Sequence, residues 1–297
     1  MNNRNTLSSN IDNMEKNGQF MEKIMSDLGG AYSAVLVYIG DKLGLYKAMR
    51  EAGRPVTSQE LADLTNTAER NVREWLANQA AGNYVTYDAS TQRYSLPPEN
   101  ALSLVEEDSP VFAIGAFQST MSFFRDAPKI IEAFKTGRGL PWEEHDPELF
   151  VGTERFFKPS YKANLISSWI PSLDNGRVQE KLKNGRAKVA DVGCGHGVST
   201  IIMAKAFPNS KFIGFDNHQA SIERARELAK EEGLSEEQIK FEVFSANDYP
   251  ITYFRNNEKY DLIAFFDCLH DMGDPVGAIS HAIQSIKPDG TAMIVEP

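Results

Sequence analysis

Cysteine is scarce in this sequence, which has only Cys194 and Cys268 among 297 residues. Two cysteines make no disulfide framework, so a reducing compartment is the expected environment. Long apolar runs are also missing, since none reaches the roughly 18 residues that span a bilayer. The polar N-terminus lacks the apolar segment of a secretion signal. We therefore expect a soluble, cytoplasmic chain with no membrane partner.

Positive charge is in short supply as well. The chain has 31 Lys and Arg against 41 Asp and Glu, a formal net charge of −10. Proteins that bind nucleic acid gain affinity by neutralising phosphates with Lys and Arg, so we expect no nucleic acid partner. What is present, 41% hydrophobic and 24% charged residues, is typical of a globular protein of about two domains.

The first third of the chain is predicted to be a tail and a small domain. Residues 1–18 are polar without apolar periodicity, which predicts a disordered tail. Residues 19–105 show helical spacing, a capping-box pattern at Thr57 and Glu60, a second helix near 68–81 and two β-rich runs around a polar turn. This is the order of a winged helix. Its second helix carries as many glutamates as arginines, which favours dimerisation over DNA binding.

The rest of the chain changes pattern twice. Residues 106–186 are helical and irregular, with aromatics at helical spacing that suit either a core or the wall of a small-molecule site. We interpret them as a helical linker or substrate cap. Residues 187–297 alternate strand and helix, with strands predicted at 188–192, 211–215, 239–244, 260–266 and 291–295. Such β-α-β repeats predict a parallel sheet covered on both faces. The fold class is α/β, preceded by an α-rich winged-helix-like domain.

A glycine-rich run follows the first strand of residues 187–297. Asp191 ends the strand, and Gly193, Gly195 and Gly197 follow it. Glycine lets the main chain approach a ligand closely, and the amides of the next helix favour negative charge. A dinucleotide fingerprint would place a third glycine at Val198. The pattern therefore disfavours NAD, and a plain glycine-rich connector is the remaining alternative.

Polar residues also close the next two strands. Asp216 lies 19 residues after Gly197, near the interval of an acid that binds ribose hydroxyls. A helix cap or a turn is its other interpretation. After the third strand, Ser245, Ala246 and Asn247 can contact the edge of an adenine, or simply form a turn. The glycine loop in register favours the ribose role for Asp216.

These features resemble class I S-adenosylmethionine (SAM)-dependent methyltransferases. The glycine run matches their motif I, Asp216 their motif II, Tyr260–Ile263 their fourth strand, and Lys287–Gly290 the turn before their fifth. The winged-helix front and helical middle are similar to small-molecule O-methyltransferases, in which the front end dimerises. A closer likeness is to an uncharacterised bacterial group with the run Phe-Asp-Cys-Leu-His-Asp-Met.

This resemblance implies a Rossmann-like sheet, SAM as cofactor, a small-molecule methyl acceptor and a homodimer formed through the N-terminal domain. It implies that SAM contacts a set of residues at the carboxyl ends of the strands. These are Asp191, Gly193, Cys194, Gly195, Gly197, Asp216, Asn217, Ser245, Ala246, Asn247, Phe266 and Asp267.

The fourth strand leads into a run that suits proton transfer. Methylation of a hydroxyl needs a base, and histidine has an unperturbed pKa near 6.5. His270-Asp271 resembles the His-Asp pair of plant O-methyltransferases, which implies His270 as general base; a loop histidine bonded to backbone is the alternative. Asp267, Asp271 and Asp274 could gather around a divalent ion, but acids after strands are commonly caps, so we expect no metal. Cys268 is expected to pack near the cofactor.

Two rival functions and one missing feature remain. A SAM-binding winged-helix regulator without methyl transfer is the main alternative to an enzyme, and an NAD-dependent oxidoreductase is the third candidate.

Class I methyltransferases add two strands after the fifth, whereas this sequence ends at Pro297. An uncovered strand edge invites pairing. We therefore expect a C-terminally incomplete sheet, either a fragment of a longer chain or one whose edge a partner covers.

Overall fold

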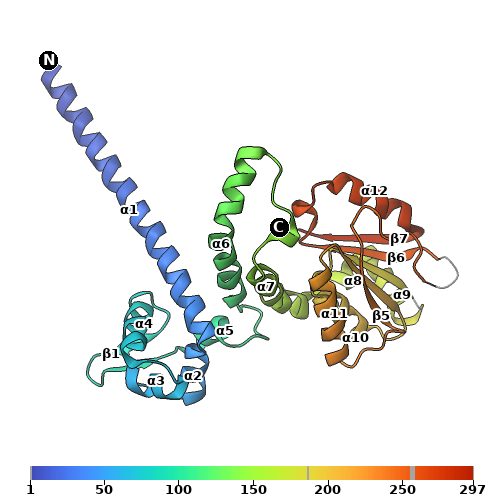
Figure 1. The fold of residues 1–297 in the computed structure, drawn as a ribbon, viewed down its shortest axis with the longest axis horizontal. Coiled ribbons are helices and arrows are strands. Elements are labelled where there is room, and N and C mark those ends of the chain that lie inside the picture. The colour runs from blue at the N-terminus through green and yellow to red at the C-terminus, as the bar shows by residue number, and fades with distance from the viewer. Residues whose placement is uncertain (1, 186, 255–257, 297) are drawn as a thin grey trace. The chain divides into compact units, whose positions relative to one another are not determined.

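The computed structural model describes residues 2–185, 187–254 and 258–296. The chain divides into two compact units, Met1–Glu106 and Glu107–Pro297. The first is helical with a small hairpin, and the second contains a parallel sheet (Figure 1). Among the helices of the described ranges, none combines the length and apolar character needed to cross a membrane.

The first unit has the order of elements of a winged helix. In this unit β1 and β2 pair antiparallel. The Thr57 hydroxyl accepts the Glu60 N–H, and the Glu60 carboxylate accepts the Thr57 N–H, which confirms the predicted capping box. The elements are α1 (Asn2–Lys42), α2 (Leu45–Ala52), α3 (Ser58–Thr65), α4 (Glu69–Ala81), β1 (Thr86–Asp88), β2 (Arg93–Ser95) and α5 (Pro98–Leu104).

Helix α1 differs from the sequence prediction. The disordered tail was predicted over residues 1–18; residues 2–18 are helical, and residue 1 lies outside the described residues. Extending a helix costs less than nucleating one, and the far end of α1 is fixed by packing. The Trp75 Nε1–H donates to the Leu36 carbonyl at 2.8 Å, and a Cβ at Gly40 would lie 2.5 Å from the Trp75 ring. From there α1 projects beyond the other helices of its unit (Figure 1).

The second unit is a five-stranded parallel sheet in the order β5-β4-β3-β6-β7. Buried clusters pack on both faces, one including residues of α10 and α11 and the other including Ala282 of α12. The strands are β3 (Lys188–Val192), β4 (Lys211–Asp216), β5 (Ile239–Val243), β6 (Tyr260–Phe266) and β7 (Ile286–Val295). The helices between them are α10 (Val198–Ala206), α11 (Gln219–Glu231), the short η4 (Leu269–Asp271) and α12 (Pro275–Ser285).

Residues 107–186 belong to the same compact unit as the sheet. Helices α6 and α7 pack on each other, and a Cβ at Gly115 of α6 would lie 2.4 Å from the Phe156 nitrogen of α7. The elements are α6 (Ile114–Thr136), η1 (Trp142–Glu144), α7 (Glu148–Asn164), a π turn η2 (Leu165–Trp169), α8 (Ile170–Ser172), η3 (Leu173–Gly176) and α9 (Arg177–Asn184).

The predicted turn before the fifth strand lies inside β7. Tyr260 pairs with Ile286, but Leu262 pairs with Thr291, so the register shifts between these two positions. Residues 287–290 therefore form an irregularity in the strand rather than a separate turn. The other four strands begin at the predicted residues, and β3 and β6 keep both predicted bounds.

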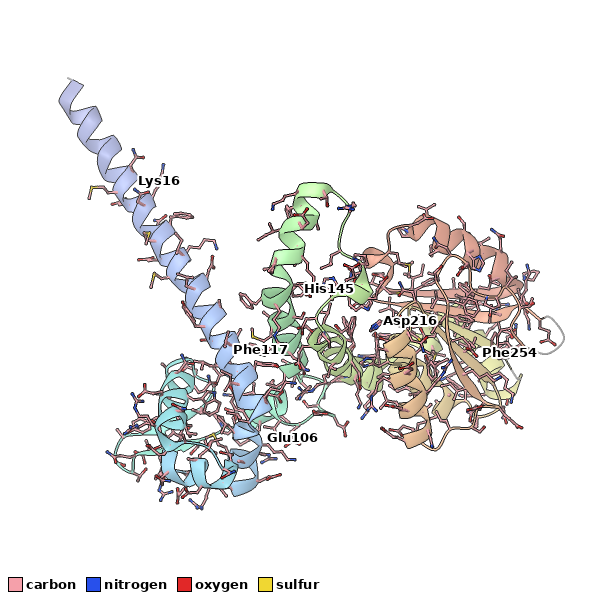
Figure 2. All side chains as sticks on the ribbon, viewed as in Figure 1. Lys16, Glu106, Phe117, His145, Asp216 and Phe254 are labelled. Atoms are coloured by element: carbon pink, nitrogen blue, oxygen red, sulfur yellow. The ribbon has the colours of Figure 1, made fainter. Side chains whose placement is uncertain are left out.

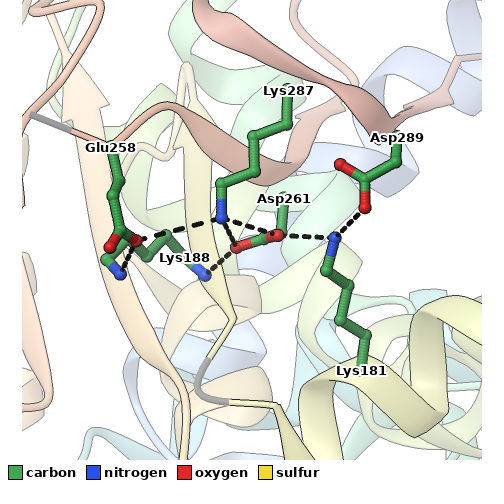
Figure 3. Close-up of polar contacts among 6 residues, drawn as sticks. All are labelled: Lys181, Lys188, Glu258, Asp261, Lys287 and Asp289. Carbon is green, nitrogen blue, oxygen red and sulfur yellow. Dashed lines mark hydrogen bonds and ion pairs between the residues drawn. The ribbon is translucent and has the colours of Figure 1, made fainter.

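A buried carboxylate ties together the amino-terminal ends of β3, β6 and β7 (Figure 3). Asp261, whose side chain is 4% exposed, lies 2.7 Å from Lys181 Nζ and 3.0 Å from Lys287 Nζ. It also accepts the Lys188 backbone N–H at 2.8 Å. Burial alone would raise the pKa of Asp261, but these donors outweigh it and hold the pKa below its ordinary value.

Replacing Asp261 by Asn should destabilise the protein by about 1–3 kcal/mol, because the half-buried ammonium groups of Lys181 and Lys287 lose their shared charge partner. A carboxyl with a lowered pKa stabilises only while it is ionised, so the deficit should shrink as the pH falls below about 4. Urea denaturation of both proteins across this range measures it. Asp289→Asn, which removes an exposed partner of Lys181, is the control and should change little.

Candidate functional site

A cavity of about 960 Å³ opens at the carboxyl ends of β3, β4, β5 and β6. Loops after these strands form one side, and α6, α7 and the segment between them form the other. An open α/β sheet binds its ligands at this edge. The volume lies at the upper end of the usual range for small-molecule sites, which leaves room for two small ligands.

The cavity brings most of the predicted site residues together. Both predicted catalytic residues and ten of the twelve predicted cofactor residues line it, whereas Asp191 and Gly197 are not among the residues that line it. The residues present are Gly193, Cys194, Gly195, Asp216, Asn217, Ser245, Ala246, Asn247, Phe266, Asp267, His270 and Asp271.

Three glycines shape the loop between β3 and α10. Gly193, Gly195 and Gly197 have φ angles of 74°, 52° and 76°, in the left-handed region that favours glycine. A Cβ at Gly197 would lie 2.5 Å from the Phe241 ring, and one at Gly193 would lie 2.8 Å from Cys268 Sγ. A Cβ at Gly195 would meet no protein atom within 4 Å. Gly193 and Gly197 therefore serve packing, and Gly195 keeps the cavity side of the loop open.

Asp191 is fully buried beneath this loop. Its Oδ2 accepts the hydroxyls of Ser199 and Thr200, each at 2.6 Å, which fixes the first turn of α10. Its Oδ1 has no partner among the described residues. Burial raises the pKa of Asp191 to about 6. Buried polar atoms are rarely left unpaired, so the orphan oxygen fits a ligand or a water that brings a donor into the loop.

Asp216 ends β4 and lines the cavity. Its Oδ2 accepts the Gly195 N–H at 2.8 Å and its Oδ1 accepts the His218 N–H at 2.9 Å. The N-cap residue of α11 is His218, so Asp216 stabilises the turn rather than capping the helix. Each carboxylate oxygen retains a further lone pair. Burial raises the pKa of Asp216, and the group is suited to accept two hydroxyl donors.

His270 lies just after β6, between two carboxylates. Its Nδ1 is 2.5 Å from Glu296 Oε2, and its Nε2 is 3.5 Å from Asp271 Oδ2. The other oxygen of Glu296 accepts the backbone N–H groups of Cys268 and Leu269 at 3.0 and 2.8 Å. The hydrogen bond with Glu296 raises the pKa of His270. Sequence reasoning missed Glu296, although an acid directly after the fifth strand was a usable signal.

The carboxylates near His270 are arranged differently from the sequence expectation. Asp267, His270 and Glu296 each place a ligand atom within 4.8 Å of the others, in place of the three aspartates considered from the sequence. Glu296 is already engaged with His270 and two backbone amides, so the group is suited to holding a base in place. Burial raises the pKa of Cys268, so its thiol stays protonated and packs against Gly193.

The helical side of the cavity is largely aromatic, and a histidine–carboxylate hydrogen bond joins it to the glycine loop. His196 Nδ1 lies 2.7 Å from Glu154 Oε2 on α7, with both side chains mostly buried. The sequence left open whether the aromatics of residues 106–186 form core or a site wall; several of them line the cavity. These are Phe123, Trp142, Phe150, Phe156, Phe157 and Tyr161.

Comparison with known proteins assigns both parts of the chain. Residues 183–297 match a family described as a methyltransferase domain, and residues 31–106 match an Rv2258c-like winged HTH domain. The ubiquinone biosynthesis O-methyltransferase of Pasteurella multocida is 34% identical over 138 residues, which are 45% of this chain and 53% of that protein. The chain thus spans about half the length of the curated relatives it matches.

Solved structures share the fold along nearly the whole chain. The mitomycin 7-O-methyltransferase gives a TM-score of 0.68 at 19% identity, over 95% of this chain and 81% of its own. The human N-acetylserotonin methyltransferase, solved with SAM, gives 0.61 at 19% identity over 93% and 79%. The resemblance inferred from the sequence is confirmed: residues 183–297 match a methyltransferase domain, residues 31–106 match a winged helix-turn-helix domain, and the fold is that of solved O-methyltransferases.

Proposed function

We propose that this protein is a SAM-dependent methyltransferase that methylates an oxygen of a small molecule. The observation that carries the proposal is that Gly195, Asp216 and His270 line one cavity. On this proposal the residues that would bind the donor and the residue that would act as base face one space. The methyltransferase domain and the O-methyltransferases among the structural neighbours support the same reaction.

The residues of the cavity fit SAM, which when bound supplies a methyl group on a positively charged sulfur. Asp216 would accept the ribose hydroxyls, and Gly195 leaves the space for close approach of the ligand. The orphan oxygen of Asp191 suits a donor from the methionine part. The N-terminal amides of α10 favour its carboxylate. Ser245, Ala246 and Asn247 form the wall beside β5, where the adenine edge would lie.

His270 would take the proton from the acceptor hydroxyl. An ionised Glu296 only accepts hydrogen bonds, so Nδ1 of a neutral His270 donates to it and Nε2 keeps its lone pair. Nε2 would then be free to take the proton of the acceptor hydroxyl. The imidazolium that forms is stabilised by the charges of Glu296 and Asp271.

Calorimetric titration of the whole chain with SAM tests the donor site, and release of S-adenosylhomocysteine with phenolic acceptors tests transfer. A protein that does not bind SAM would contradict the proposal. Binding without transfer, together with retarded migration of duplex DNA at physiological salt, would favour the regulator instead. The arginines of α4 argue against that outcome, because Arg70 pairs with Glu74 and Arg73 lies 3.7 Å from Glu69.

We also propose that the protein is a homodimer formed through α1. An exposed apolar stripe runs along this helix, with spacings that alternate between four and three residues from Met21 to Ile39. That is the 3.5-residue repeat of a coiled-coil seam, and its uncharged side chains suit a second copy of the same stripe. In proteins, most of the stability of a helix comes from the packing of its apolar face. The α1 stripe consists of Met14, Met21, Met25, Leu28, Tyr32, Val35 and Ile39.

Glutamates placed in the α1 stripe should convert the dimer to a monomer. In the double variant Met25→Glu, Leu28→Glu, the paired stripes would bury unpaired carboxylates, which is costly. Sedimentation of the whole chain should then give the monomer mass. Ser26→Glu, an exposed change on another face of α1, is the matched control and should stay dimeric. A wild-type monomer, or a dimer that survives the double change, contradicts the proposal.

A further inference from the structure

A second histidine–carboxylate pair is built from the helical side of the cavity. Asp126 on α6 has a side chain only 2% exposed, and its Oδ2 lies 3.0 Å from His145 Nδ1. The same oxygen accepts the Asp146 N–H at 2.8 Å, and Oδ1 lies 3.1 Å from Lys129 Nζ. Burial alone would raise the pKa of Asp126, but these donors outweigh it and hold the pKa below its ordinary value. Asp126 is therefore ionised near neutral pH.

An ionised carboxylate fixes the tautomer of His145. Because the carboxylate only accepts, Nδ1 must donate to it, and Nε2 of the neutral ring keeps its lone pair. The side chain of His145 is mostly buried, 13% exposed, and it lines the cavity that also contains Asp216 (Figure 2). In the neutral ring Nε2 is thus left as a hydrogen-bond acceptor on the helical side of the site, apart from His270.

The surroundings of His145 are aromatic. The ring centroids of Phe123 and Trp142 lie 6.5 and 5.9 Å from that of His145. Trp142 packs edge-on against Phe150 at 5.6 Å, and Phe150 lies 4.4 Å from His218, just after β4. Flat apolar walls with few polar groups fit a planar aromatic ligand whose polar groups are met at fixed points.

We propose that His145 anchors the methyl acceptor by accepting a hydrogen bond at Nε2. The acceptor is then a flat aromatic molecule that carries a second hydroxyl or N–H donor besides the hydroxyl that is methylated. Asp126 is the positioning residue that fixes the His145 tautomer. The inference rests on the proposed function for the identity of the reaction. A carboxylate in place of the donor would be repelled by the lone pair and by Glu143 and Glu154 of the wall.

Binding of simple aromatic probes tests this anchor. The isomeric dihydroxynaphthalenes and the two naphthols are titrated into the whole chain saturated with S-adenosylhomocysteine, with quenching of tryptophan fluorescence as the readout. One dihydroxynaphthalene isomer should bind the wild type about tenfold more tightly than either naphthol, since sites built to hydrogen-bond a donor reject analogues without it. Ten-fold corresponds to one hydrogen bond of about 1.4 kcal/mol.

The variant His145→Asn tests the proposed hydrogen bond of Nε2 without removing the contact with Asp126. Its amide N–H can replace Nδ1–H toward Asp126, but it has no atom in place of Nε2. It should bind S-adenosylhomocysteine and melt like the wild type while its preference for the diol disappears. A wild type with no preference for any diol overturns the proposal, as does a variant that keeps the preference. If S-adenosylhomocysteine does not bind, the proposed function fails, and the probe comparison without it still decides the role of His145.

Discussion

Replacing Asp216 by Ala should weaken SAM binding by a factor of about 10²–10⁴. The carboxylate is proposed to accept both ribose hydroxyls, and a hydrogen bond to a charged group contributes about 1.5–3 kcal/mol. Calorimetric titration of both proteins with SAM measures the loss. Asp289→Ala alters an exposed carboxylate at the opposite end of the sheet and should bind as the wild type. Equal affinity in the Asp216 variant would remove the ribose role.

The glycines of the loop give a paired test of the same site. Gly195→Ala should keep the fold, at a cost of about 1–2 kcal/mol for a side chain at positive φ, yet bind SAM poorly because its methyl group enters the open side. Gly197→Ala should lower the stability more than Gly195→Ala does, because its Cβ would lie 2.5 Å from the Phe241 ring. Thermal unfolding followed by SAM titration distinguishes the two. If both variants lost only stability, the loop would be a connector rather than a cofactor site.

Replacing His270 by Ala should slow methyl transfer by about 10²–10⁴-fold, the usual contribution of a general base. SAM affinity should stay within a few-fold of the wild type, because the histidine is proposed to act on the acceptor. Single-turnover rates with a phenolic acceptor, together with SAM titration, measure both quantities. An unchanged rate would mean that His270 is not the base and that the protein acts only by positioning the acceptor.

The pH dependence of the rate identifies the base more directly. The hydrogen bond with Glu296 raises the pKa of His270 above its ordinary value, so the protonated, inactive ring persists to higher pH than for a free histidine. The rate should therefore rise with pH through a value above about 6.5. In Glu296→Gln the charge that favours the protonated ring is lost, so the same limb should move to lower pH while the maximal rate falls. If the rising limb of the pH–rate profile does not move in Glu296→Gln, the His270–Glu296 pair does not set the pH dependence of the rate.

Features that a short stretch of chain determines could be predicted from the sequence. The strand Lys188–Val192 is an apolar run with a glycine loop directly after it, and Asp216 ends the next strand, so local pattern and the topology of parallel sheets place them at one edge. The capping box at Thr57 and Glu60 is likewise contained in four residues. The helix over residues 2–18 was missed because its continuation depends on packing at the other end of α1.

Pairs joined only by folding could not be predicted. His270 meets Glu296 across 26 positions of the chain, and Glu154 meets His196 across 42. Each pair depends on the order of strands or on the path of α7, neither of which is contained in local periodicity. A single acidic residue after a strand or on a helix has many ordinary roles. The residue type alone therefore did not mark Glu296 or Glu154 as part of the site.

The irregularity at residues 287–290 has a consequence for the position of Glu296. Side chains alternate between the faces of a strand, so a one-residue slip in β7 would turn Glu296 away from His270. Pairing resumes at Thr291 with Leu262 after the irregularity, which separates the start of β7 from the part that leads to Glu296. The register of Thr291–Val295 against β6 therefore fixes which face the following Glu296 presents to His270.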